Sequence, residues 1–124
     1  MKTIVLIDDD EDEFLIFSEA LDVLKTQNTC VYLNNDTAAL DWFRSNHADF
    51  VFIDMMMPKI NGIELLGQIK KITNIRHTQF IILSSFVDEG LMEKALAQGA
   101  TTCLQKPDTV SNFSSILAQL FSGS

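Results

Sequence analysis

The sequence has little cysteine, proline or glycine. Two prolines and five glycines in 124 residues leave no stretch that resembles a flexible linker between domains. The two cysteines, Cys30 and Cys103, lie far apart and match no metal-ligand spacing. Hydrophobic residues nevertheless make up 47% of the chain, enough for a folded core and too many for a disordered segment. We therefore expect one domain over residues 1–124, with nothing attached at either end.

Basic residues are also scarce. Nine lysines and arginines stand against 17 aspartates and glutamates, which gives a formal net charge of −8. Because phosphate backbones and anionic membranes are bound by clustered positive charge, this balance disfavours nucleic acid and a membrane surface as partners. It is compatible with a protein that attracts cations or docks basic protein surfaces.

No long apolar run is present. The first, Ile4–Ile7, is shorter than the roughly 7–15 residues of a secretory signal. No run approaches the roughly 18 apolar residues of a membrane span. We therefore expect a cytoplasmic protein whose cysteines are reduced.

Short apolar runs alternate with amphipathic segments along the chain. Continuously apolar runs of this length are typical of strands buried on both faces of a parallel sheet. The segments between them place apolar residues three and four apart, as on one face of a helix. The predicted strands are Ile4–Ile7, Cys30–Leu33, Phe50–Ile53, Phe80–Leu83 and Thr102–Leu104, and Asp36 and Asn61 are predicted helix N-caps. Five such β-α units predict a doubly wound α/β sandwich.

Polar residues follow the predicted strands. Because ligands bind beyond the carboxyl ends of parallel strands, these residues are candidates for a site. They are Asp8, Asp9 and Asp10 after the first strand, Asp54 after the third, Ser84 and Ser85 after the fourth, and Lys106 after the fifth. Each alone has a plainer explanation, since acids favour helix starts and hydroxyls satisfy nearby backbone groups.

The combination predicts phosphoryl chemistry. Grouped carboxylates repel unless a cation lies among them, and oxygen-rich sites suit Mg²⁺. Asp54 follows a buried strand, where an unpaired carboxylate is costly. It would attack phosphorus, with Mg²⁺ held by Asp9 and Asp54 and assisted by Asp8 through water. Lys106 and the Ser84 hydroxyl would bind the remaining phosphoryl oxygens.

These motifs, in this order, resemble the receiver domain of response regulators. They are Ile7-Asp8-Asp9, Ile53-Asp54-Met55-Met56-Met57-Pro58, Asn61-Gly62, Leu83-Ser84-Ser85 and Lys106-Pro107. The resemblance implies a flavodoxin-like fold with strand order 2-1-3-4-5 and a stand-alone receiver without an output domain. It also implies Mg²⁺ or Mn²⁺ bound by Asp9, Asp54 and the Met56 carbonyl. Met56 and Phe86 occupy positions that in the family modulate the lifetime of the phosphoryl group.

The same resemblance implies partners. A sensor histidine kinase or a histidine phosphotransfer protein would supply the phosphoryl group, and an unknown protein target would read it. The domain would be a signalling switch rather than a metabolic enzyme. Small hydrolases of the haloacid dehalogenase type carry an acid where this chain has Met56, and flavodoxins need a Ser/Thr/Gly-rich loop where this chain has acids.

Cys103 departs from the family pattern. Receivers usually carry an aromatic residue three positions before the lysine, and its ring turns inward on activation. A thiol cannot do this, so an alternative is a docking module that is not phosphorylated. In the implied strand order, Cys30 and Cys103 lie on opposite edges of the sheet, about 19 Å apart, too far for a disulfide.

Overall fold

The computed structural model describes residues 1–73 and 77–123. Within them, five parallel strands form one sheet in the order β2-β1-β3-β4-β5, which confirms the predicted fold. The strands are β1 (Lys2–Ile7), β2 (Asn28–Leu33), β3 (Phe50–Asp54), β4 (Gln79–Ser84) and β5 (Thr102–Gln105). The helices that alternate with them are α1 (Glu11–Leu24), α2 (Asp36–Phe43), α3 (Gly62–Ile72), α4 (Glu89–Gln98) and α5 (Val110–Ser122).

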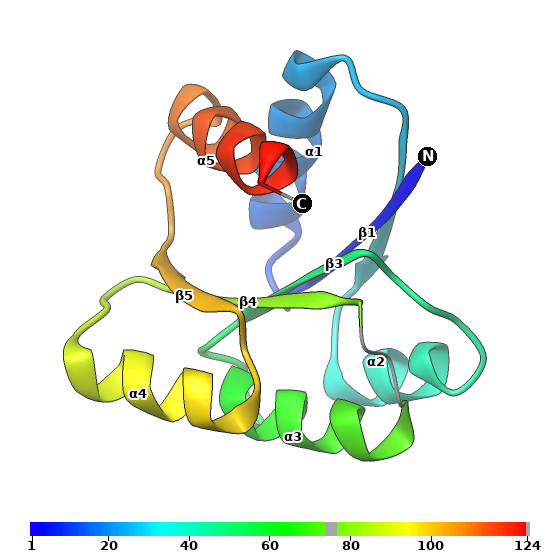
Figure 1. Cartoon of the computed structure of the whole chain (residues 1–124), viewed down its shortest axis with the longest axis vertical. Helices are drawn as coiled ribbons and strands as arrows, with labels where there is room; N and C mark the ends of the chain where they lie inside the picture. Colours follow the sequence, from blue (N-terminus) through cyan, green and yellow to red (C-terminus); the bar gives the residue numbers. More distant parts are fainter. Residues whose placement is uncertain (74–76, 124) are drawn as a thin grey trace.

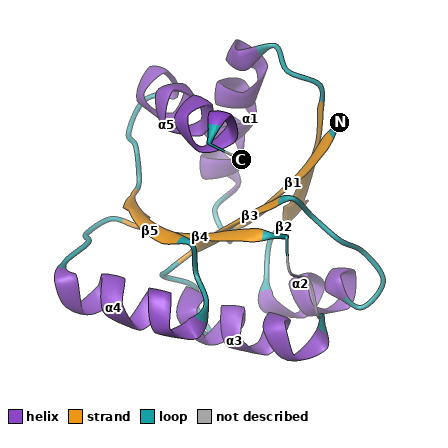
Figure 2. Cartoon of the chain, in the orientation of Figure 1, coloured by secondary structure: helices purple, strands orange, loops and turns teal. Residues whose placement is uncertain are grey.

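Helices cover both faces of the sheet. Helices α1 and α5 lie on one face, and α2, α3 and α4 lie on the other (Figure 1 and Figure 2). Successive residues of a strand point to opposite faces, so Val5 packs in the core beneath α2–α4 and Ile4 in the core beneath α1 and α5. All residues of β3 are buried. The apolar runs of the sequence are therefore explained by burial on two sides.

The helix starts partly match the predicted caps. Asn61 begins α3 with a capping box, in which its side chain accepts from the Glu64 N–H and the Glu64 side chain accepts from the Asn61 N–H. The prediction for α2 was wrong by one residue: Asn35 is the N-cap, and Asp36 is the first helical residue. The Asn35 side chain accepts from the Ala38 N–H at 2.7 Å, and Asp36 instead places its charge in the first turn, where the helix dipole favours it.

The two cysteines lie on opposite edges of the sheet and are free, as predicted. Burial raises the pKa of the Cys30 thiol to about 11, with a smaller contribution from Asp22, and burial also raises the pKa of Cys103. Both are therefore protonated at neutral pH and poor nucleophiles. In the parts of the chain that the structure describes, no helix combines the length and the apolar character needed to cross a bilayer.

Candidate functional site

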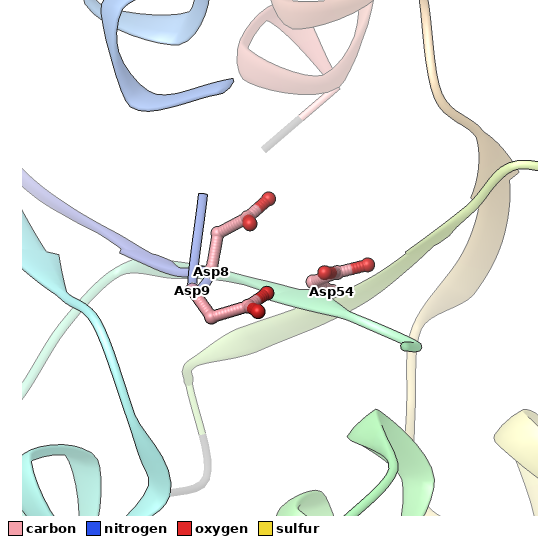
Figure 3. Close-up of side chains that lie close together, drawn as sticks. All are labelled: Asp8, Asp9 and Asp54. Atoms are coloured by element: carbon pink, nitrogen blue, oxygen red, sulfur yellow. The ribbon is translucent and has the colours of Figure 1, made fainter. Parts of the chain in front are cut away.

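Three carboxylates meet where β1 and β3 end. Asp8 and Asp9 follow the last residue of β1, and Asp54 is the last residue of β3. Because these strands are neighbours in the sheet, the side chains lie close together (Figure 3). One oxygen of each carboxylate lies within 4.8 Å of the others. Acids at the ends of two strands that are distant in the sequence therefore form one acidic cluster.

The three acids differ in burial. Asp8 and Asp54 are 1% and 3% exposed, whereas Asp9 is exposed. Backbone N–H groups hold the two buried carboxylates in place. The Asp10 N–H donates to Asp8 Oδ1 at 2.9 Å, and the Met56 N–H donates to Asp54 Oδ1 at 3.2 Å. Asp9 remains open to solvent at the edge of the cluster.

Lys106 brings a positive charge to the two buried acids. Its Nζ lies 3.0 Å from Asp54 Oδ1 and 3.6 Å from Asp8 Oδ2. Its backbone N–H donates to the Ser84 carbonyl at 2.8 Å, which fixes the β5–α5 loop beside the end of β4. Burial opposes the charge of the ammonium, but the hydrogen bond to Asp54 and the nearby carboxylates outweigh it and raise the Lys106 pKa. The lysine is therefore charged at neutral pH.

Asp8 is held in an unfavourable environment for its charge. Burial raises its pKa from the ordinary 3.8 to about 6, and the neighbouring Asp54 and Glu13 charges add to the effect. The hydrogen bond from Asp10 and the positive charge of Lys106 act in the opposite direction without cancelling it. A carboxylate of this kind gains from any cation placed beside it.

Ser84 is buried at the end of β4, but its hydroxyl is engaged with the loop that follows. Ser84 Oγ donates to the Phe86 carbonyl at 2.8 Å and accepts from the Phe86 N–H at 3.4 Å. The Phe86 side chain is 69% exposed. To bind a group on Asp54, the hydroxyl must exchange the Phe86 carbonyl for a new acceptor.

Gly62 allows α3 to approach the acidic cluster closely. Its N–H donates to the Met55 carbonyl at 3.0 Å. A Cβ at this position would lie 2.6 Å from the Asp54 carbonyl oxygen, well inside van der Waals contact. In the sequence, Gly62 was noted only as part of the Asn61-Gly62 motif. The structure explains why this residue is a glycine, since a larger one would collide with the Asp54 backbone.

Glu13 was missed as a member of the site. In the sequence it belongs to the acidic run after the first strand, which is explained equally well by a solvated helix start. The structure places Glu13 Oε1 3.8 Å from Lys106 Nζ. A signal was present, because Glu13 is four residues before the fully buried Phe17 and so shares its helical face.

The cluster has the composition of a hard-cation site. Asp8, Asp9 and Asp54 supply carboxylate oxygens, which Mg²⁺ and Mn²⁺ prefer. Asp9 also lines a cavity of about 210 Å³ between the β2–α2 and β3–α3 loops, whose other walls include Asn34, Asn35, Met57, Pro58 and Lys59. The residues present therefore fit a divalent cation. Such a cation would be accessible to solvent on the side of Asp9 and the cavity.

Comparison with known proteins identifies the family. The chain matches the response regulator receiver domain over residues 4–118. It is 23% identical over 112 residues to the polar-differentiation response regulator DivK of Brucella ovis, covering 90% of this chain and 89% of that protein. The signal receiver domain of a DNA-binding response regulator from Colwellia psychrerythraea aligns with a TM-score of 0.82 and 22% identity, over 98% of this chain and 99% of that one.

A further solved structure, the Mn²⁺-bound form of response regulator Rcp1, aligns with a TM-score of 0.81 and 18% identity, over 98% of this chain and 93% of that one. At these identities the structural matches show the shared fold. The family match extends from β1 into α5 and includes all the acids at the ends of β1 and β3 as well as Lys106. The chain therefore belongs to the response regulator receiver domain family.

Proposed function

We propose that this receiver is a cytoplasmic signalling switch that accepts a phosphoryl group on Asp54. The donor is a phosphohistidine of a sensor kinase or a histidine phosphotransfer protein, and the product changes the contacts of the domain with a downstream protein. The observation that carries the proposal is the burial of Asp54 beside Asp8 and 3.0 Å from the Lys106 ammonium. One ion pair would satisfy a buried structural carboxylate, whereas a second buried carboxylate beside it adds repulsion that a bound cation offsets.

The transfer uses one oxygen of the Asp54 carboxylate as the nucleophile. It forms a bond to phosphorus while the bond from phosphorus to the imidazole nitrogen breaks, and that nitrogen keeps the electron pair. Asp9, Asp54 and the Met56 carbonyl would hold a divalent cation, with Asp8 assisting through water, and the cation would neutralise the phosphoryl charge. Rcp1, a protein of the same fold, has been solved in a Mn²⁺-bound form, so binding of a divalent cation is compatible with this fold.

Lys106 and Ser84 complete the proposed site. The Lys106 ammonium moves from the Asp54 oxygen to a phosphoryl oxygen, so its charge remains compensated throughout. The Ser84 hydroxyl leaves the Phe86 carbonyl and donates to a second phosphoryl oxygen. This exchange links the phosphoryl group to the loop before α4, so that occupancy of Asp54 shifts the population of loop conformations.

The test is incubation with acetyl phosphate and intact mass spectrometry. We expect a single phosphoryl adduct on the parent in the presence of Mg²⁺, none after chelation of the metal, and none on an Asp54→Asn variant. A matched control, Asp49→Asn, changes an acid at the opposite end of β3 and should be phosphorylated like the parent. An adduct that persists on Asp54→Asn would contradict the assignment of the acceptor.

A second candidate function is a docking module that works without phosphorylation. Cys103 favours it, because this buried thiol occupies the place of the aromatic residue through which receivers usually respond. The docking module predicts that Asp54→Asn binds its partner as well as the parent does. It also predicts no uptake of beryllofluoride, a phosphoryl mimic, with Mg²⁺ present. The retained acids and lysine make the switch the better supported function.

A further inference from the structure

Glu13 occupies the helix position at which a glutamate often forms a capping box. Counting from the N-cap Asp10, it is the third residue of α1. At the same position of α3, Glu64 accepts from the N-cap backbone in a capping box. Glu13 instead places its carboxylate 3.8 Å from Lys106 Nζ, and only 30% of the side chain is exposed. The Glu13 side chain therefore contacts the lysine of the site instead of capping the helix.

Lys106 is shared by three acids. Its Nζ lies 3.0 Å from Asp54, 3.6 Å from Asp8 and 3.8 Å from Glu13. Only the Asp54 oxygen lies at hydrogen-bond distance from the ammonium, and Asp8 and Glu13 attract it as ion-pair partners. When a phosphoryl oxygen replaces the Asp54 oxygen as the hydrogen-bond acceptor, the ammonium turns to it against the attraction of Asp8 and Glu13. Asp54 carries the phosphoryl group and Asp8 faces the cation site, which leaves Glu13 as the partner with no other role there.

We infer that Glu13 is a positioning residue that holds the Lys106 ammonium in the unphosphorylated protein and competes with the incoming phosphoryl group for it. The inference rests on the proposed function, because it concerns the same lysine. The expected effect of Glu13 differs from the general repulsion between an acidic residue and an anion, because it acts through the contact with Lys106. Removal of the Glu13 charge should therefore strengthen the binding of a phosphoryl group only while Lys106 is present.

The experiment measures the affinity for beryllofluoride with saturating Mg²⁺ by ¹⁹F NMR on the full chain. We expect Glu13→Gln to bind roughly threefold more tightly than the parent, the size typical of a partly exposed ion pair. Glu13→Met, of similar length but without an amide, should behave likewise. The matched control is Asp12→Asn, which removes an exposed charge from the same helical turn and should produce less than half of the change.

A double-mutant cycle with Lys106→Gln separates contact from general charge. In that background Glu13→Gln should change the affinity no more than Asp12→Asn does. Unchanged or weaker binding by Glu13→Gln, or the same gain without the lysine, would overturn the inference while leaving the switch intact. Failure of the parent itself to bind beryllofluoride would contradict the proposed function, and the role of Glu13 with it.

Discussion

An Asp8→Asn variant should be more stable than the parent in metal-free buffer at neutral pH, by roughly 2–3 kcal/mol. Folding raises the pKa of Asp8 from 3.8 to about 6, so between these values the unfolded chain binds fewer protons than the folded one. The metal-free fold therefore loses stability as pH rises through this range, and the loss is complete above about pH 6. Asparagine keeps an oxygen for the Asp10 N–H and removes the buried charge.

Denaturant unfolding with a chelator, from about pH 5 to about pH 7.5, measures this effect. The advantage of Asp8→Asn over the parent should grow with pH. The matched control is Asp9→Asn, which removes an exposed acid of the same cluster and should gain little stability. Saturating Mg²⁺ should stabilise the parent more than either variant, since a cation compensates the repulsion. An advantage of Asp8→Asn that does not vary with pH would show that burial of its charge is not the cause.

Gly62→Ala should damage both the fold and the site. The new Cβ would lie 2.6 Å from the carbonyl oxygen of Asp54 and 3.1 Å from Met55 Cα, and neither atom can rotate away because both belong to the backbone. We expect a loss of about 1–3 kcal/mol of stability, the usual cost of overpacking. Since the clash displaces Asp54, the proposed acceptor, the rate of phosphorylation by acetyl phosphate should fall roughly tenfold or more.

Gly90→Ala is the matched control for this prediction. Gly90 also lies in the first turn of a helix, α4, but a Cβ there meets only Asp88 Oδ1 at 3.5 Å, an ordinary contact. Alanine should leave the stability unchanged or raise it by up to about 1 kcal/mol, with normal phosphorylation. Equal behaviour of the two variants in thermal unfolding and in the acetyl phosphate assay would contradict the prediction. It would show that neither stability nor phosphorylation requires the close approach of α3 to Asp54.

Much of the fold could be predicted because burial leaves a local record in the sequence. A strand covered on both faces must be apolar throughout, and Phe50–Ile53 is. Helices that cover one face show the 3.6-residue period, as in the α3 residues Leu65, Leu66 and Ile69. Parallel strands share an edge at their carboxyl ends, so the acids after β1 and β3 could be assigned to one site.

Helix ends were less predictable. Asn35 and Asp36 are adjacent, and both are common N-caps. The choice depends on the path by which the chain leaves β2, which places the Asn35 side chain over the Ala38 N–H. Neighbouring candidates at a helix start cannot be separated by residue type.

The sequence by itself determined the α/β class, the strand-end acids and the lysine, because these follow from residue type and from the order of strands. Only the tertiary structure decided that Asp8 is buried while Asp9 is exposed, and that Glu13 reaches Lys106. Only it showed that the Ser84 hydroxyl is bonded to Phe86. Those facts depend on how loops leave the sheet and how α1 lies against β5–α5, and such distances arise from packing between segments far apart in the chain.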